Sequence, residues 1–143
     1  MADFVVVNGD TAMFLPTFGI ANVTVAPGVI IGTGTADVNG ASVCVEGDEA
    51  SVVVPGCAYV TTAGHVTPGA GILTISGLGS DQVASSTDNN GTPLILMGTT
   101  FDATFTVVSP AVIPGTPPVS DVGGTEYAGS GNFITTNTVV EAT

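Results

Sequence analysis

Hydrophobic positions along this chain occur in short runs of valine, isoleucine, phenylalanine and threonine, separated by glycine, proline, asparagine and aspartate. Such runs are typical of β-strands joined by tight turns. No stretch keeps the 3.6-residue period of an amphipathic helix. The pattern therefore predicts an all-β protein, with strands at residues 3–7, 22–26, 29–32, 42–46, 51–54, 58–61, 71–76, 93–97, 103–108 and 132–140.

A short unit occurs twice within this pattern. Each copy opens on an Asn-Gly pair, Asn39-Gly40 or Asn90-Gly91, and closes on a glycine, Gly47 or Gly98. Asn-Gly suits a two-residue hairpin turn, so a glycine-rich β protein can contain such turns without any repeat. The apolar residues between them favour one supersecondary unit built twice. The matched pairs are Val43 with Leu94, Cys44 with Ile95, and Val45 with Leu96.

The segments around the repeat differ in composition. Residues 31–108 contain both copies and form the expected β core. Residues 1–30 contain apolar side chains interrupted by Pro16 and Gly19, which predicts an N-terminal arm. Residues 109–143 begin with four prolines in ten positions, which favours an extended polyproline II segment over a central strand. The remainder of that segment is expected to form a C-terminal β extension.

The charge of the chain excludes several function classes. Its 143 residues contain no lysine or arginine and 12 acidic residues, giving a formal net charge of −12. Binding to nucleic acid through counterion release needs cationic side chains, and so does attraction to anionic lipid. The acidic surface favours a component of a soluble particle, or a partner with a basic surface. No apolar run approaches the roughly 20 residues that span a bilayer.

Few residues could carry chemistry. His65, together with Cys57, could belong to a zinc or iron site, but a tetrahedral site needs four ligands. Cys44, an aspartate or a water molecule would have to complete it. The simpler interpretation is a histidine that is hydrogen-bonded locally or exposed to solvent. Because Cys44 matches Ile95 in the repeat, we expect a buried thiol there, although two cysteines could also form one disulfide.

The acidic pairs Asp48/Glu49 and Asp81/Asp88 could be interpreted as catalytic carboxylates or a calcium site. No Asp-x-Asp-x-Asp-Gly calcium loop is present, and aspartate in glycine-rich loops is chiefly a turn residue. The chain also lacks a Gly-x-Ser-x-Gly nucleophile motif. We therefore expect these carboxylates to be turn residues and solvated charges, and we predict no enzymatic activity.

The repeat resembles that of a known family. Val38-Asn39-Gly40 and Gly47-Asp48 have the spacing of the Val-Asn-Gly to Gly-Asp repeats in PAAR proteins. The second copy keeps Asn90-Gly91, Pro93 and Gly98. The chain thus resembles PAAR-like spike-tip proteins of contractile injection systems, such as type VI secretion or phage-tail-like particles. Two departures are Ser42-Val43-Cys44-Val45 in place of Pro-Ala-Ala-Arg, and Thr99 in place of the final aspartate.

This resemblance implies a structural role. Such proteins form a compact, cone-shaped β-fold that caps and sharpens a trimeric spike for membrane puncture, with one tip per trimer. The implied partners are the spike and, in some systems, an effector; contact with the target membrane is transient, and no nucleic acid is bound.

The resemblance also implies assembly in the cytoplasm and release to the outside with the particle. Residues 1–15 lack the basic start and apolar run of a secretory signal peptide. We expect no cofactor, with a structural zinc or iron at Cys57 and His65 as the alternative. The alternative functions are a β-rich decoration protein of a capsid, an ice- or sugar-binding protein, or a small metal-dependent enzyme.

Overall fold

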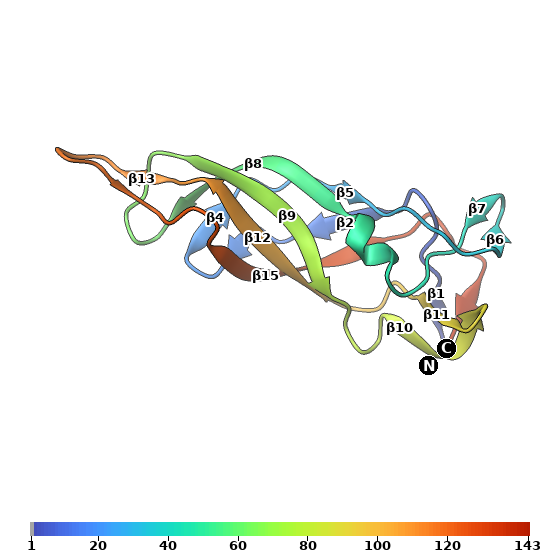
Figure 1. Cartoon of the computed structure of the whole chain (residues 1–143). Coiled ribbons are helices and arrows are strands. Elements are labelled where there is room, and N and C mark those ends of the chain that lie inside the picture. Colours follow the sequence, from blue (N-terminus) through green and yellow to red (C-terminus); the bar gives the residue numbers. More distant parts are fainter. Residues whose placement is uncertain (1) are drawn as a thin grey trace.

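The computed structural model describes residues 2–143, which form antiparallel β-strands and one short 3-10 helix, η1 (Asp48–Ser51). The molecule is elongated (Figure 1). One large sheet occupies its middle, short strand pairs gather at the end that holds both termini, and a narrow hairpin projects from the opposite end. The prediction of an all-β protein is confirmed.

The strands are β1 (Asp3–Phe4), β2 (Thr11–Phe14), β3 (Thr17–Phe18), β4 (Ala21–Val23), β5 (Gly28–Val29), β6 (Asp37–Val38), β7 (Ala41–Ser42), β8 (Val53–Thr61), β9 (Gly69–Gly77), β10 (Val83–Asn89), β11 (Thr92–Ile95), β12 (Phe101–Ser109), β13 (Val112–Ile113), β14 (Val119–Ser120), β15 (Glu126–Ile134) and β16 (Glu141–Ala142). Within residues 2–143, no helix has the length and apolar character needed to cross a membrane.

The large sheet contains eight strands in the order β3-β4-β8-β9-β12-β15-β2-β5. Its two sides come together because only Leu15 and Pro16 separate β2 from β3. The Leu15 amide donates to the Ser130 carbonyl of β15, and the Val23 amide of β4 donates to the Pro16 carbonyl, both at 2.9 Å. The chain therefore crosses from one side of the sheet to the other within two residues, and the sheet curls around its own core.

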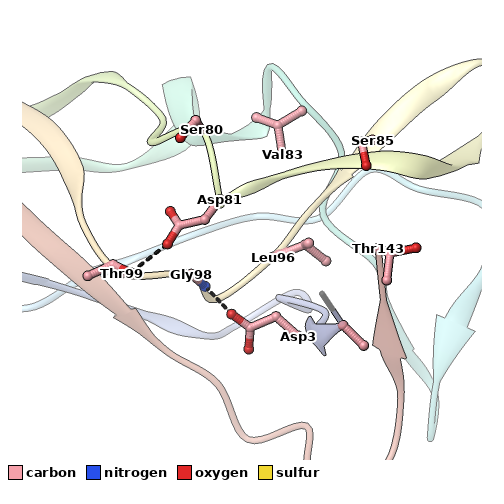
Figure 2. A pocket seen from close by; sticks show the side chains of 10 residues that line it. Asp3, Ser80, Asp81, Val83, Ser85, Leu96, Gly98, Thr99 and Thr143 are labelled. Carbon is pink, nitrogen blue, oxygen red and sulfur yellow. Dashed lines mark hydrogen bonds between the residues drawn. The ribbon is translucent and has the colours of Figure 1, made fainter.

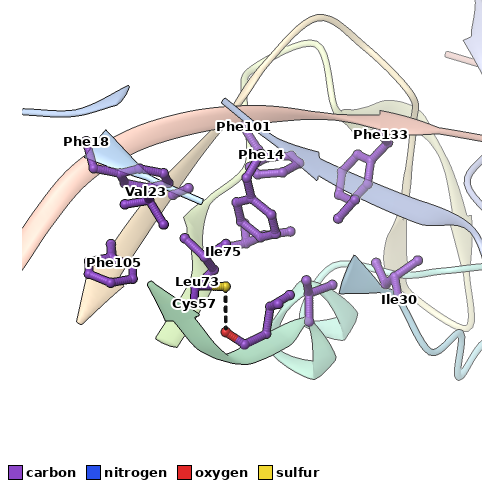
Figure 3. Close-up of a cluster of buried hydrophobic side chains, with 14 of the residues drawn as sticks. Phe14, Phe18, Val23, Ile30, Cys57, Leu73, Ile75, Phe101, Phe105 and Phe133 are labelled. Carbon is purple, nitrogen blue, oxygen red and sulfur yellow. Dashed lines mark hydrogen bonds between the residues drawn. The ribbon is translucent and has the colours of Figure 1, made fainter. Parts of the chain in front are cut away.

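Five phenylalanines fill this core (Figure 3). Side chains alternate between core and solvent along the long strands, so each ring reaches the centre from an inward-facing position. The rings of Phe14 and Phe101 lie 5.5 Å apart, and those of Phe101 and Phe133 lie 5.0 Å apart. The rings of Phe18 and Phe105 follow at 6.1 Å. Such aromatic pairs stabilise a core by about 0.5–1.5 kcal/mol each beyond their burial.

Two glycines of β15 make room for these rings. A Cβ atom at Gly129 would lie 2.4 Å from the Phe18 ring, and one at Gly131 would lie 2.6 Å from the Phe101 ring. Glycine in a strand often marks such a close approach. The same glycines make the segment resemble a turn in sequence, which is why the strand predicted at 132–140 lies too late: the structure has β15 at Glu126–Ile134.

The segments expected to be arms are part of the large sheet. Residues 1–30 supply β2, β3, β4 and β5, and residues 109–143 supply β15. Phe14, Phe18 and Phe133 are all buried. The division into a 31–108 core with an N-terminal arm and a C-terminal extension is therefore wrong for these strands. Their buried positions are few and are interrupted by Pro16 and Gly19, so the alternation was too short to recognise.

Two predicted strands, 51–54 and 58–61, are joined in the single strand β8 (Val53–Thr61). Pro55 and Gly56 lie in a bulge, where the pairing of β8 with β9 shifts between Val54 and Cys57. Gly56 has a positive φ of 72°, a backbone conformation that β-bulges often contain and that glycine adopts without steric strain. The proline-rich segment, as expected, contributes no central strand and forms only the short strand β13.

Candidate docking base and apex

Three copies of one backbone unit meet at the end of the molecule that holds the termini. The copies are residues 5–10, 43–48 and 94–99, each with three apolar residues, one further residue, a glycine, and an aspartate or threonine. We name these copies, together with the strand pairs β1–β16, β6–β7 and β10–β11, the base. The repeat predicted from the sequence contained only the second and third copies.

A ring of backbone hydrogen bonds joins the middle residues of the three copies. The Val6 amide donates to the Ile95 carbonyl, the Ile95 amide to the Cys44 carbonyl, and the Cys44 amide to the Val6 carbonyl. Each of these distances is 2.9 Å. Every copy therefore donates once and accepts once, which closes the ring.

A second ring runs in the opposite order, from the amide two residues after the middle residue of one copy to the carbonyl two residues before the middle residue of the next. Its donor and acceptor pairs are Asn8 N with Ser42 O at 2.7 Å, Glu46 N with Pro93 O at 2.8 Å, and Met97 N with Phe4 O at 2.9 Å. The isolated β-bridges follow the same cycle: Val5 with Leu96, Val7 with Val43, and Val45 with Leu94. The base thus has approximate three-fold symmetry within a single chain.

Two of the three copies are preceded by an Asn-Gly hairpin. Asn39 and Asn90 have φ angles of 53° and 55°, and Gly40 and Gly91 have φ angles of 88° and 87°. Positive φ at both central residues is the requirement of a type I′ turn, so the predicted turns are confirmed. The first copy, residues 5–10, is preceded by the strand pair β1–β16 in place of a hairpin. Asp3 pairs with Ala142 there, in the same register in which Ala41 pairs with Val38 in β6–β7.

The apolar residues of the copies serve two cores. Val6, Cys44 and Ile95 are fully buried and belong to the core of the large sheet. Their neighbours form a second cluster inside the base, made of Val5, Val7, Val38, Val43, Ala84, Leu94, Leu96 and Ala142. Cys44 is therefore the buried apolar position predicted from its match to Ile95. Burial, followed by the carboxylates of Asp48 and Asp10, raises the pKa of the Cys44 thiol to about 12.

The aspartate at the end of each of the first two copies binds back to the backbone of its own copy. Asp10 accepts a hydrogen bond from the Val7 amide at 2.8 Å, and Asp48 accepts one from the Val45 amide at 2.9 Å. Each also accepts from the backbone and hydroxyl of a threonine, Thr136 or Thr33. Because Asp10 and Asp48 are only 1% and 8% exposed, the expectation of solvated charges is wrong for Asp48. The predicted role of Asp48 as a turn residue is confirmed, and Asp10 has the same role.

In the third copy the aspartate and the threonine of this hydrogen-bonded pair exchange positions. Thr99 takes the position of the aspartate, and its hydroxyl donates to the carboxylate of Asp81. The amide that the aspartate would otherwise bind is already paired, because Leu96 donates to the Gln82 carbonyl at 2.8 Å. The departure of Thr99 from the family pattern is therefore an exchange of donor and acceptor, which moves the carboxylate to the exposed Asp81.

Comparison with models of protein families gives an independent result. A model of contractile injection system spike tip proteins matches residues 1–143. The chain belongs to this family. The resemblance drawn from the repeat is thereby confirmed, and the family's role is that of a structural tip on the spike. No curated protein sequence matches this spike tip protein.

The opposite end of the tip protein is a narrow hairpin of β13 and β14, which we name the apex (Figure 1). Its foot is held by the Asp121 carboxylate, which accepts hydrogen bonds from Tyr59 at 2.7 Å and Tyr127 at 2.9 Å. The Tyr59 hydroxyl in turn accepts from the Ala111 amide at 3.0 Å. Partial burial alone would raise the pKa of Asp121, but the hydrogen bonds from Tyr59, the Val122 amide and Tyr127 outweigh it and lower that pKa.

Charge is distributed unequally between the two ends. Residues 103–125, which include the apex, contain Asp121 as their only charged side chain. The exposed valines Val66, Val108, Val119 and Val122 lie in or beside this region. Most carboxylates belong to the base and its flanking turns: Asp3, Asp10, Asp37, Glu46, Asp48, Glu49, Asp81, Asp88 and Glu141. The tip protein is thus acidic at the base and nearly uncharged at the apex.

The two residues considered for a metal site lie in different surroundings. His65 follows β8, and its Nδ1 atom is 2.6 Å from the Thr61 hydroxyl, which is the local hydrogen bond expected from the sequence. Cys57 is a buried free thiol whose Sγ lies 3.8 Å from the Val54 carbonyl, and burial raises its pKa. The described residues bring no group of three or more histidine, cysteine, aspartate and glutamate side chains together for a metal ion.

Proposed function

We propose that the base caps the end of a trimeric spike, with one tip per trimer, and that the apex leads into the target membrane. The observation that carries this proposal is the cyclic arrangement of three equivalent units in one chain. A trimer presents the same surface three times around its axis. A single chain can meet all three surfaces in the same way only if it repeats its own contacts, as the base does.

The charges of the base support the same partner. Asp37, Asp88 and Glu141 are exposed and occupy equivalent positions, since they pair with Ser42, Pro93 and Phe4 in the three strand pairs. Each spike subunit would therefore meet one carboxylate. Because complementary charge steers and orients association, we expect a lysine or arginine on the facing end of each spike subunit.

The composition of the apex supports its place at the leading end. Charged side chains are costly inside a bilayer, and the projecting hairpin has none between Pro110 and Ser120. Its four prolines also have no backbone N–H to remove from water. A narrow, uncharged point opposite an acidic base fits transient entry into a membrane.

In this proposal the protein acts without catalysis and without a cofactor. It is assembled onto the spike in the cytoplasm and leaves the cell with the particle. The structural role of its family favours this function over capsid decoration, over ice or sugar binding, and over a metal-dependent enzyme.

Charge neutralisation tests the docking. Asp37→Asn, Asp88→Asn and Glu141→Gln are each expected to weaken binding to the purified spike trimer by about two- to fivefold, the range of single exposed ion pairs. The three losses should be similar because the positions are equivalent, and Glu126→Gln, in the large sheet, serves as the control. Losses confined to one of the three positions, or as large for the control, would contradict three-fold docking.

A further inference from the structure

A pocket of about 350 Å³ opens between the third copy of the base and strand β1, which precedes the first copy (Figure 2). Asp3 and Asp81 contribute carboxylates, Ser80, Ser85 and Thr143 contribute polar side chains, and Leu96 and Val83 contribute apolar surface. The pocket therefore combines negative charge with an apolar wall. None of these residues donates or accepts a hydrogen bond of the two backbone rings.

Both carboxylates are fixed in place. The Gly98 amide donates to Asp3 at 2.8 Å, and the Thr99 hydroxyl donates to Asp81 (Figure 2). The hydrogen bond from Thr99 lowers the pKa of Asp81, so this side chain is ionised at neutral pH. The pocket thus presents two oriented acceptors in a chain that has no lysine or arginine to pair with them.

The three-fold symmetry of the base is broken at this pocket. At the other two junctions the position of Asp3 is taken by Ala41 or Thr92, according to the strand register. The position of Asp81 is taken by Thr136 or Thr33, which bind the buried Asp10 and Asp48. Two carboxylates therefore line one pocket at this junction and at neither of its counterparts.

We propose that this pocket receives one lysine or arginine side chain of the spike, an inference that rests on the proposed docking of the base. Such a side chain has an apolar stem, which would pack on Val83 and Leu96, and a cationic head, which would bind Asp3 and Asp81. A symmetric spike offers three copies of the side chain, and one enters the pocket. This contact fixes the rotation of the tip on the spike.

Small amides test the pocket without the spike. N-acetyl-lysinamide and N-acetyl-argininamide are added to the ¹⁵N-labelled protein, with N-acetyl-norleucinamide as an uncharged control of similar stem. We expect the amide signals of residues 80–83 and 98–99 to shift with the two cationic probes only.

Asp81→Asn and Asp3→Asn keep an acceptor oxygen for Thr99 or Gly98, and each should weaken this binding by about tenfold, as for the loss of a charge-assisted hydrogen bond. Glu126→Gln should leave it unchanged.

The spike provides the second measurement. Asp81→Asn should weaken the complex with the spike trimer by about tenfold, and in a variant that carries both Asp3→Asn and Asp81→Asn a neutral substitution of the matching spike lysine or arginine should have little further effect. Equal shifts with the norleucine probe, or none with the cationic probes, would overturn the pocket while leaving the docking of the base intact. A protein that binds the cationic probes but not the spike would overturn the docking and, with it, the proposed occupant.

Discussion

Individual charged residues stabilise the base from within. Asp10 and Asp48 are buried carboxylates, and each accepts hydrogen bonds from its own turn and from a threonine of a neighbouring segment. The glycine before each aspartate has positive φ, 89° at Gly9 and 107° at Gly47, which lets the chain turn back so that the carboxylate reaches the amide three residues earlier. The Gly-Asp pair is therefore a device for closing a turn.

The reversed pair of the third copy can be tested at the same scale. Thr99→Asp would place a second carboxylate against Asp81 and should lower the free energy of unfolding by about 0.5–1.5 kcal/mol, the net contribution of one hydrogen bond, because the pair is exposed to water. Adding Asp81→Thr restores one donor and one acceptor, and most of the loss should be recovered. Urea unfolding of the two single variants and the double variant measures this coupling. Additive losses would show that Thr99 and Asp81 do not act as a pair.

At the scale of the elements, β15 depends on the absence of side chains at two positions. Gly129 and Gly131 let the Phe18 and Phe101 rings lie directly against the strand. This contact ties the N-terminal strands to the C-terminal part of the chain, which explains why neither segment is a separate arm.

A methyl group at Gly129 should therefore disturb the core. Gly129→Ala would bring a Cβ atom within 2.4 Å of the Phe18 ring and should lower the free energy of unfolding by about 1–3 kcal/mol, the usual cost of overpacking. Gly115→Ala is the matched control, because the nearest atom to its Cβ would be 3.5 Å away and the residue is exposed. Chemical denaturation compares the two; equal stability of both variants would contradict the packing described.

The foot of the apex hairpin has its own pH dependence. Burial raises the pKa of both Tyr59 and Tyr127 to about 12, and Asp121 adds to the shift, while the unperturbed value is 10.0. The folded protein therefore binds more protons than the unfolded chain between pH 10 and 12, and its stability should fall as the pH rises through this window.

Ultraviolet absorbance can follow this titration directly, because the chain contains two tyrosines and no tryptophan. Tyrosinate should form with a midpoint near pH 12 in the folded protein and near pH 10 in denaturant. Asp121→Asn should lower the folded midpoint, since it removes the negative charge beside both hydroxyls. A folded midpoint near pH 10 would mean that the hairpin is not held by this network.

At the scale of the whole molecule, part of the architecture was predictable from the sequence. The long strands β9 and β12 and the turns at Asn39-Gly40 and Asn90-Gly91 follow from alternation and turn chemistry. The first copy of the base was missed because no Asn-Gly pair precedes it: the strand pair β1–β16 takes the place of the hairpin. Its signal is the pattern of three apolar residues, one residue, glycine and aspartate that residues 5–10 share with 43–48.

The remaining features depend on contacts that no local pattern records. The polar strand β10 (Val83–Asn89) forms because it pairs with β11, and β1 pairs with β16 from the far end of the chain. The pocket between Asp3 and Asp81 likewise joins residues that are distant in sequence. Together these contacts give the molecule a three-fold acidic base at one end and an uncharged point at the other.

An electron cryo-microscopy map of the tip bound to its spike, processed without imposed symmetry, tests this polarity most directly. We predict one tip on three spike subunits, with residues 5–10, 43–48 and 94–99 arranged around the spike axis and the β13–β14 hairpin pointing away. Three tips on one trimer, or a spike bound to the β13–β14 hairpin, would contradict the docking of the base.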